Sequence, residues 1–376
     1  MITSILGIQL VGTIIPAPDA LPLPAPAPVL FFLLQLTFLL HLLAMNALLG
    51  GLIITLVARL RGKGPDDPWT QLADSIAKTS PSLVAATVNL GVAPLLFLQT
   101  LMGQFFFTSS ILMGWGWFSV VVVLIFAYYG TYLQSFKGSG LGRLQKPILA
   151  VTVLLFLWVA FMFSNNNTLM LQTKQWAGMY FNDARGLHLN LGDPQLWPRY
   201  LHMVLGAVAV AGLMLAWWGR VRHMRGDERG AFMVRVGINN FTWVTLVNIL
   251  VGLWFFMALP SDVRKLFMGG DPGASAMFGI GFVLAIGMFV LGFLARLRGP
   301  RVRLVMPTAM TIVQMIVMIT MRDVVRNGYL GELYRPAEFA VKTQTLNLVI
   351  FGVLLVGGVL TVIWMVRRLY LGWENS

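Results

Sequence analysis

The sequence contains no cysteine, and only 11% of its 376 residues are charged. The absence of cysteine excludes disulfides, iron–sulfur clusters, thiolate ligation of haem and covalent c-type haem attachment. Soluble domains carry about 25% charged residues, so the low charge excludes a soluble enzyme of this length. What the chain has instead is apolar: 57% of its residues are hydrophobic. This composition predicts a polytopic integral membrane protein.

Apolar runs separated by short charged breaks recur along the whole chain. A membrane-spanning helix needs ~20 mostly apolar residues. The runs therefore predict an all-α membrane bundle of about nine transmembrane helices, over residues 29–58, 80–104, 110–134, 147–163, 198–219, 237–259, 275–295, 303–321 and 345–366. They form one transmembrane domain, 29–366. An extracytoplasmic or interfacial segment, 1–28, precedes it, and a cytoplasmic tail, 367–376, follows.

The basic residues, which give a formal net charge of +13, are unevenly distributed between the connections. With the N-terminus outside, the inner segments hold 18 of the 27 basic residues, and 27 − 18 = 9 remain outside. The positive-inside rule then predicts an N-out, C-in orientation. The expected partners of this charge are anionic membrane lipids, with no nucleic acid. The inner set is Arg59, Arg61, Lys63, Lys78, Lys137, Arg143, Lys146, Arg220, Arg222, Arg225, Arg229, Arg235, Arg296, Arg298, Arg301, Arg303, Arg367 and Arg368.

Two histidines fall inside predicted spans, where an ionisable residue is costly and usually functional. His41 lies in the first span and His202 at the outer end of the fifth. A lone intramembrane histidine is often only hydrogen-bonded to a neighbouring helix. The alternative is haem, whose iron takes His or Met ligands. Met277 begins the seventh span at a depth similar to that of His202. Gly279 and Gly281 would let a flat macrocycle approach the backbone.

A charged cluster closes the eighth span at the predicted outer boundary. It consists of Arg322, Asp323 and Arg326, of which Asp323 and Arg326 share one helix face. One interpretation is an ordinary interfacial salt-bridge cluster. The other is a carboxylate that ligates or adjoins a haem iron, with arginines holding the propionates. The outer loop 165–198 carries Trp176, Tyr180 and Trp197, which we interpret as an interfacial aromatic belt.

Taken together, these motifs resemble subunit I of the cytochrome bd family of quinol oxidases. Thr37, His41 and Gly50 match the spacing of that family's first helix. The second-helix motif is matched by Asn89, Gly91, Val92, Ala93, Gln99 and Gly103, with Gln99 where the family has Glu. The fifth-helix ligand corresponds to His202, the M-x-G-x-G motif to Met277, Gly279 and Gly281, and the E-x-x-R pair to Asp323 and Arg326. The resemblance covers nearly all spans in order.

The resemblance implies nine spans and haems grouped near the outer face. The implied iron ligands are His41, His202, Met277 and Asp323, with Gly279, Gly281, Arg322 and Arg326 also in contact with haem. The implied catalytic residues are His41, Gln99, Asp323 and Arg326. The cofactor would be haem b, with one to three haems bound and haem d as an alternative. A second membrane subunit and a location in the bacterial inner (cytoplasmic) membrane are implied as well.

The chain departs from this family at two places that bear on function. The family's quinol site lies in a long loop between the sixth and seventh helices, whereas this connection is only Pro260–Ala274. The GRQPW signature is also absent, with Val325 and Asn327 flanking Arg326. We therefore expect a c-type cytochrome as electron donor. Gln99 cannot exchange a proton as a carboxylate does.

Three functions remain open from the sequence. The first is an oxidoreductase that takes electrons at the outer face and reduces oxygen, as a terminal oxidase does. The second is an electron-transfer membrane subunit of a larger redox complex, without oxygen reduction. The third is a non-haem transporter or channel, in which His41, Gln99 and Asp323 line a polar path.

Overall fold

The structure, a computed structural model, describes residue 16 and residues 21–299 and 303–372. Most of the predicted N-terminal segment 1–28 and the last four residues lie outside these ranges. Within the described residues, nine helices are long and apolar enough to cross a membrane. They are α2 (Ala27–Arg61), α3 (Pro68–Met113), α4 (Trp115–Tyr132), α5 (Gln145–Leu171), α7 (Leu196–Met224), α8 (Arg229–Ala258), α10 (Pro272–Arg298), α11 (Val305–Leu330) and α12 (Thr345–Gly372). The predicted fold class is confirmed, and the chain is a multi-pass membrane protein.

Several helices extend beyond the apolar runs that predicted them. α3 begins at Pro68 instead of residue 80, because the Asp67 carboxylate caps the Trp69 amide at 2.8 Å and Pro68 occupies the first turn. α5 continues to Leu171 instead of 163. Its polar last turns find partners: Asn166 donates to the Ser110 hydroxyl at 3.1 Å. Polar residues that looked like a loop are therefore helical.

The loop between α5 and α7 carries the short helix α6 (Trp176–Asn182). Trp176 was predicted to belong to an aromatic belt, and this prediction is wrong. Its side chain is 2% exposed, and its indole N–H donates to the Leu169 carbonyl at 2.9 Å. Burial among core residues satisfies both its apolar body and its single donor. Tyr180 and Trp197 are exposed, at 47% and 45%.

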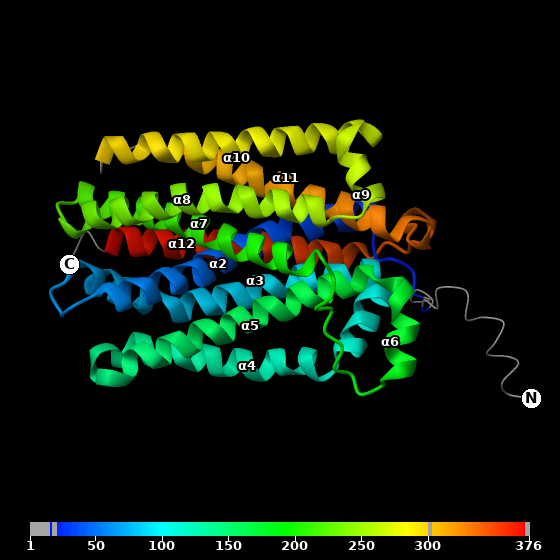
Figure 1. Cartoon of the computed structure of the whole chain (residues 1–376), viewed down its shortest axis with the longest axis horizontal. Coiled ribbons are helices and arrows are strands. Elements are labelled where there is room, and N and C mark those ends of the chain that lie inside the picture. Colours follow the sequence, from blue (N-terminus) through cyan, green and yellow to red (C-terminus); the bar gives the residue numbers. More distant parts are fainter. Residues whose placement is uncertain (1–15, 17–20, 300–302, 373–376) are drawn as a thin grey trace, which may run out of the picture.

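The spans run side by side and reverse direction at each connection (Figure 1). α2 occupies the middle of the bundle, where it packs against α3 and α7 and also meets α5 and α11. The close approach of α2 and α7 depends on Gly50, since a Cβ at this position would overlap the Ala207 carbonyl. Small residues commonly permit such contacts between membrane helices. α2 is thus placed to bring His41 against several neighbours.

The two ends of the bundle differ in what they carry. We call the end where α2 begins and α11 finishes the Asp323 end. The opposite end, where α2 finishes and α8 begins, is the Arg61 end (Figure 1). α6 and the short helix α9 (Ser261–Lys265) lie at the Asp323 end. The connection between α8 and α10 contains only α9 and a π-helical turn, Leu266–Gly270.

Candidate functional site

His41 is held between α2 and α3 in a defined orientation. Its Nδ1 lies 3.0 Å from the backbone carbonyl oxygen of Thr87. A carbonyl can only accept, so Nδ1 carries the proton and Nε2 keeps its lone pair. The ring lies against Gly91, where a Cβ would be 2.9 Å from His41 Cε1. The structure therefore brings together two residues of the predicted motifs, and it leaves the imidazole in the state that a metal ligand requires.

Phe38 connects His41 to the charged end of α11. The Phe38 and His41 rings stack with centroids 6.3 Å apart and an interplanar angle of 29°. On the α11 side, the Arg322 guanidinium carbon lies 4.4 Å from the Phe38 ring centroid, which is cation–π geometry. Arg322 is thereby held one aromatic ring away from His41. The structure therefore places part of the predicted charged cluster near the predicted first-helix ligand.

Asp323 forms a buried pair within this site. Its Oδ2 accepts from the Gln35 side-chain amide on α2 at 2.7 Å, and its Oδ1 lies 2.9 Å from Arg326 Nη1. The Arg326 and Asp323 side chains are only 4% and 14% exposed. The Arg326 guanidinium also lies 5.6 Å above the Phe31 ring. The pair is therefore enclosed by α2 and α11.

Arg199 of α7 adds a third guanidinium, close enough to Arg322 to interact with it electrostatically. It is 7% exposed and lies 5.0 Å over the Phe255 ring. Its Nε has no hydrogen-bond partner, and neither do Nε and Nη2 of Arg326. Buried guanidinium donors without acceptors are costly, because arginine stays charged. The arrangement fits an additional anion, and the two propionates of a haem have the required charge and planar oxygen geometry.

His202 lies in a second position, between α7 and α8. Its ring packs against Gly252, where a Cβ would be 3.1 Å from His202 Cε1. Its Nδ1 is buried beside Asn248 without a hydrogen bond of normal geometry. Met277 is half-buried near the start of α10. The pairing of His202 with Met277 on one iron stays a prediction.

The two glycines that follow Met277 have different surroundings. Around Gly279 a Cβ would meet nothing within 4 Å, so the backbone is open to approach there. Gly281 instead faces α11, since a Cβ would lie 3.2 Å from Met318 Cε. Of the two, only Gly279 leaves space that a planar ligand could occupy.

Gln99 is half-buried on α3, eight positions after Gly91. The helix is interrupted just beyond it, at Met102, whose φ of −138° and ψ of 34° are not helical. Gln99 therefore sits where α3 changes direction. Whether it faces a cofactor stays a prediction.

Sequence reasoning missed several residues that build the site, namely Gln35, Phe38, Thr87, Arg199 and Gly252. One signal was available for Gln35, which is one of only two amide side chains, with Asn46, in an apolar span that also carries His41. The contact of Thr87 is made by its backbone, which leaves no trace in the sequence. Among the described residues, no group of three or more His, Cys, Asp or Glu gathers into a site for a bare metal ion.

Comparison with known proteins identifies a fold but no family. No family model matches the sequence, and no curated protein matches it. Among solved structures, a chain of the bd oxidase from Geobacillus thermodenitrificans matches with a TM-score of 0.64 and 14% sequence identity. The match covers 93% of this chain and 100% of that chain. The chain is thus a nine-span membrane protein, counted over its described residues, and it has the fold of a bd oxidase chain.

Proposed function

We propose that this chain is a haem-binding respiratory subunit of the bacterial inner membrane, oriented N-out and C-in. It takes electrons at the Asp323 end, from a c-type cytochrome, and reduces oxygen. The proposal is supported by the bd oxidase fold and by the site at the Asp323 end. A second membrane subunit is the expected partner, by resemblance to the bd family.

The observation that carries the proposal is the state of His41. The Thr87 carbonyl fixes the proton on Nδ1, so Nε2 is available to iron, while buried arginines with unmet donors surround the position. His41 and Asp323 would hold one or two haems, and Arg322 and Arg326 their propionates. His202 and Met277 would hold a low-spin haem b. Haem supplies one-electron exchange and, at an open coordination position, oxygen binding.

The choice of donor follows from the short connection between α8 and α10. It consists of residues 259–271 and contains only α9 and the π-helical turn. The bd family's quinol site needs a long loop at this place. A cytochrome that docks at the membrane surface needs no such loop, because it delivers electrons through contact with the exposed end of the bundle.

The test is a reduced-minus-oxidised absorption spectrum of the purified protein, followed by oxygen uptake with reduced cytochrome c as donor. The proposal expects b-type haem bands and oxygen consumption. Replacing His41 by Ala should abolish oxygen uptake while His202 and its low-spin bands remain. A colourless protein would contradict the proposal and favour a transporter or channel.

A second function is favoured by one residue. Gln99 stands where the bd family has Glu, and an amide cannot deliver the protons that oxygen reduction consumes. An electron-transfer subunit without oxygen chemistry would need no such carboxylate. Haem bands without oxygen uptake would select this second function.

A further inference from the structure

The Arg61 end contains a cavity of about 310 Å³ between the end of α2, the start of α3 and α8. This volume lies at the lower end of the range for ligand sites, roughly 300–1,000 Å³. Its polar and aromatic lining residues include Arg61, Trp69, Phe232, Arg235, Asn239 and Asn240. The lining contains two arginines and no carboxylate, so its electrostatic character is positive.

An aromatic pair sets the positions of the two arginines. The rings of Trp69 and Phe232 meet edge to face, with centroids 5.1 Å apart. The Arg61 guanidinium lies 4.8 Å over Trp69, and the Arg235 guanidinium lies 5.4 Å over Phe232. Two cations from different helices are thus each held over one ring of the same aromatic pair. Among the described residues, neither has a carboxylate within ion-pair distance.

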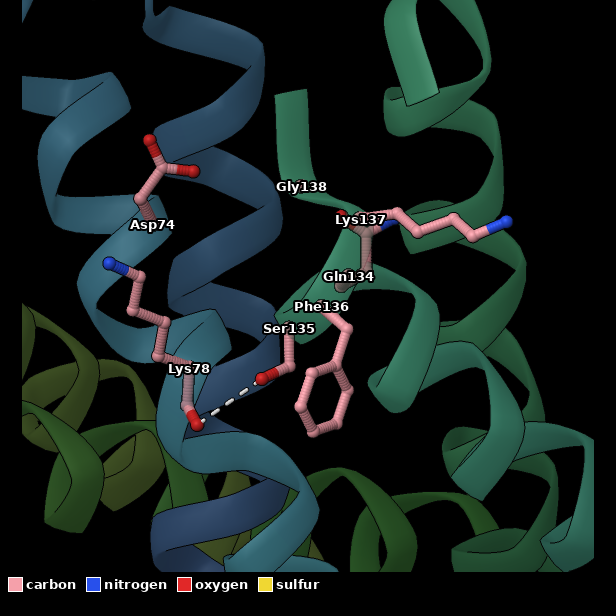
Figure 2. Close-up of a pocket in the computed structure, with 7 residues that line it drawn as sticks. All are labelled: Asp74, Lys78, Gln134, Ser135, Phe136, Lys137 and Gly138. Carbon is pink, nitrogen blue, oxygen red and sulfur yellow. Dashed lines mark hydrogen bonds between the residues drawn. The ribbon is translucent and has the colours of Figure 1, made fainter. Parts of the chain in front are cut away.

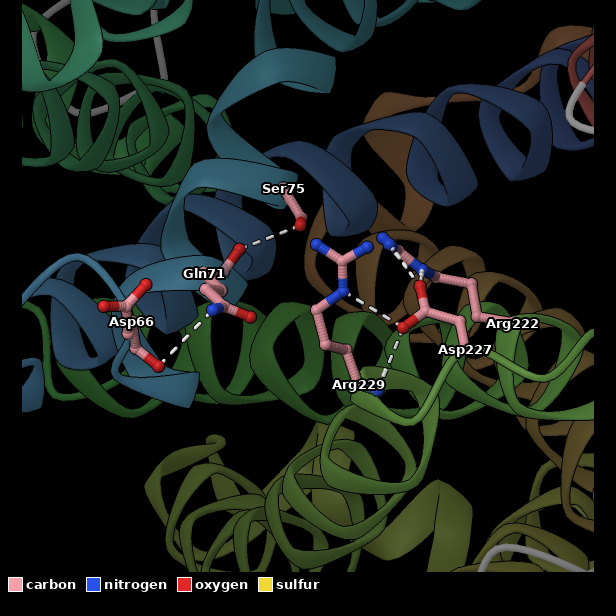
Figure 3. A network of polar contacts seen from close by, with 6 residues as sticks. All are labelled: Asp66, Gln71, Ser75, Arg222, Asp227 and Arg229. Carbon is pink, nitrogen blue, oxygen red and sulfur yellow. Dashed lines mark hydrogen bonds and ion pairs between the residues drawn. The ribbon is translucent and has the colours of Figure 1, made fainter. Parts of the chain in front are cut away.

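One carboxylate at this end, Asp227, is already neutralised by arginines of the protein. Asp227 pairs with both Arg222 and Arg229, at 2.6 Å and 3.0 Å (Figure 3). A second cavity lies beside the turn after α4 (Figure 2). It includes the carboxylate of Asp74, which binds Arg59 at 2.6 Å. The lining of that second cavity combines this carboxylate with Lys78 and Lys137, whereas the cavity between Arg61 and Arg235 has two arginines and no carboxylate, which suits an anion better.

An apolar track continues from this cavity along the exposed face of α8. Trp243, which lines the cavity, is 44% exposed, and Val247 and Leu250 are 47% and 61% exposed. Positions 243, 247 and 250 lie four and three residues apart, so they share one face of α8. A ligand that fits both regions has an anionic head and an apolar tail.

We propose that this cavity binds the headgroup of an anionic phospholipid, with its acyl chains along the exposed face of α8. Arg61 and Arg235 contact the phosphate, and Asn239 and Asn240 offer amide groups to the headgroup. The position supports a lipid over free phosphate, because the cavity opens where apolar spans end and the apolar track begins. This inference is independent of the proposed redox function.

The experiment is native mass spectrometry of the full chain, together with any subunit that co-purifies, after delipidation. Phosphatidylglycerol, phosphatidylcholine and inorganic phosphate are then titrated separately. We expect phosphatidylglycerol to bind more tightly than phosphatidylcholine. The R61Q/R235Q double variant should weaken phosphatidylglycerol binding about 30-fold, since each arginine near an anionic lipid contributes about fivefold.

The matched control is K63Q/R298Q, which removes the same charge from two exposed residues outside the cavity. It should leave phosphatidylglycerol binding unchanged. Three results would each overturn the proposal. The control could lose as much phosphatidylglycerol affinity as R61Q/R235Q, phosphatidylcholine could bind as tightly as phosphatidylglycerol, or inorganic phosphate could displace the lipid. If the double variant does not fold, the single variant R235Q decides, with an expected loss of about fivefold.

Discussion

The side-chain amide of Gln35 donates a 2.7 Å hydrogen bond to the carboxylate of Asp323, which joins the first and the eighth spans. The other oxygen of that carboxylate faces Arg326 at 2.9 Å. Both oxygens of Asp323 thus already have a partner, so iron ligation would have to use its remaining lone pairs. The carboxylate is well placed to fix Arg326 and to hold α11 against the helix that carries His41.

The first prediction concerns this contact. Asp323→Asn should destabilise the protein by about 3 kcal/mol, because it leaves the buried Arg326 without its counter-charge. Gln35→Leu should cost about 1.5 kcal/mol, the value of a hydrogen bond to a charged group. Thermal unfolding in detergent measures both changes. The double variant should cost less than the sum by about 1 kcal/mol, since the residues are in direct contact. Strict additivity would contradict the contact.

The second prediction concerns Gly91. In Gly91→Ala the new Cβ would lie 2.9 Å from His41 Cε1, so the ring must move away from the Thr87 carbonyl. We expect a folded protein whose haem content and high-spin absorption bands are reduced. Gly352→Ala is the control, because a Cβ there would meet nothing within 4 Å. Haem bands that survive Gly91→Ala unchanged would remove His41 as a ligand in this orientation.

The sequence was sufficient to predict the spans, because hydropathy depends on composition and the bilayer selects for it. The sequence was not sufficient to predict where the helices that contain these spans begin and end. The polar stretch from Pro68 to residue 79 is helical because Asp67 caps its first turn. The asparagines at the end of α5 are helical because they make contacts with a neighbouring helix. Such contacts depend on residues far away in the chain. The buried position of Trp176 was missed for the same reason, since an aromatic residue in a loop has no signature that separates a belt from a core.

The third prediction concerns the low-spin haem. His202→Ala and Met277→Leu should each remove the low-spin bands, because either change would take away one of the two side chains proposed to hold this haem. Met257→Leu serves as the control, since Met257 is 63% exposed on α8. If His202→Ala loses the low-spin bands but Met277→Leu keeps an unaltered spectrum, His202 remains a proposed haem ligand and Met277 is excluded as one.

The fourth prediction concerns the turn between α7 and α8. Partial burial acts to raise the pKa of Asp227, but hydrogen bonds from Arg229 and Arg222 outweigh it and lower the pKa below its usual value. A lowered folded-state pKa gives stability that is fully present above the unfolded value of about 3.9 and is lost as the pH falls through the folded value.

Asp227→Asn should therefore lower the melting temperature at neutral pH, and the difference from the wild type should shrink only in strongly acidic solution. Asp262→Asn is the control, because that side chain is 91% exposed. A difference that is constant down to acidic pH would assign the effect to the amide itself and not to the charge.

Part of the candidate site could be predicted from the sequence. Residues that are costly in a membrane stand out in a sequence, as His41, His202 and Asp323 did. Their partners are less visible. Thr87 acts through its backbone carbonyl, Gly91 and Gly252 through the lack of a side chain, and Phe38 through an aromatic ring among many apolar residues. These contributions appear only when the helices are placed in space.

The last prediction uses Gln99 to separate the two redox functions. If the chain reduces oxygen, Gln99→Glu should increase oxygen uptake with reduced cytochrome c, since a carboxylate can pass protons that an amide cannot. Gln99→Leu is the matched control, which removes the polar group without adding an acid. Both variants should keep the haem spectrum of the wild type. An uptake rate that is zero in the wild type and remains zero in Gln99→Glu would contradict the oxidase function, because supplying the missing proton carrier would then have failed to restore the reaction. The haems would in that case serve electron transfer to a partner.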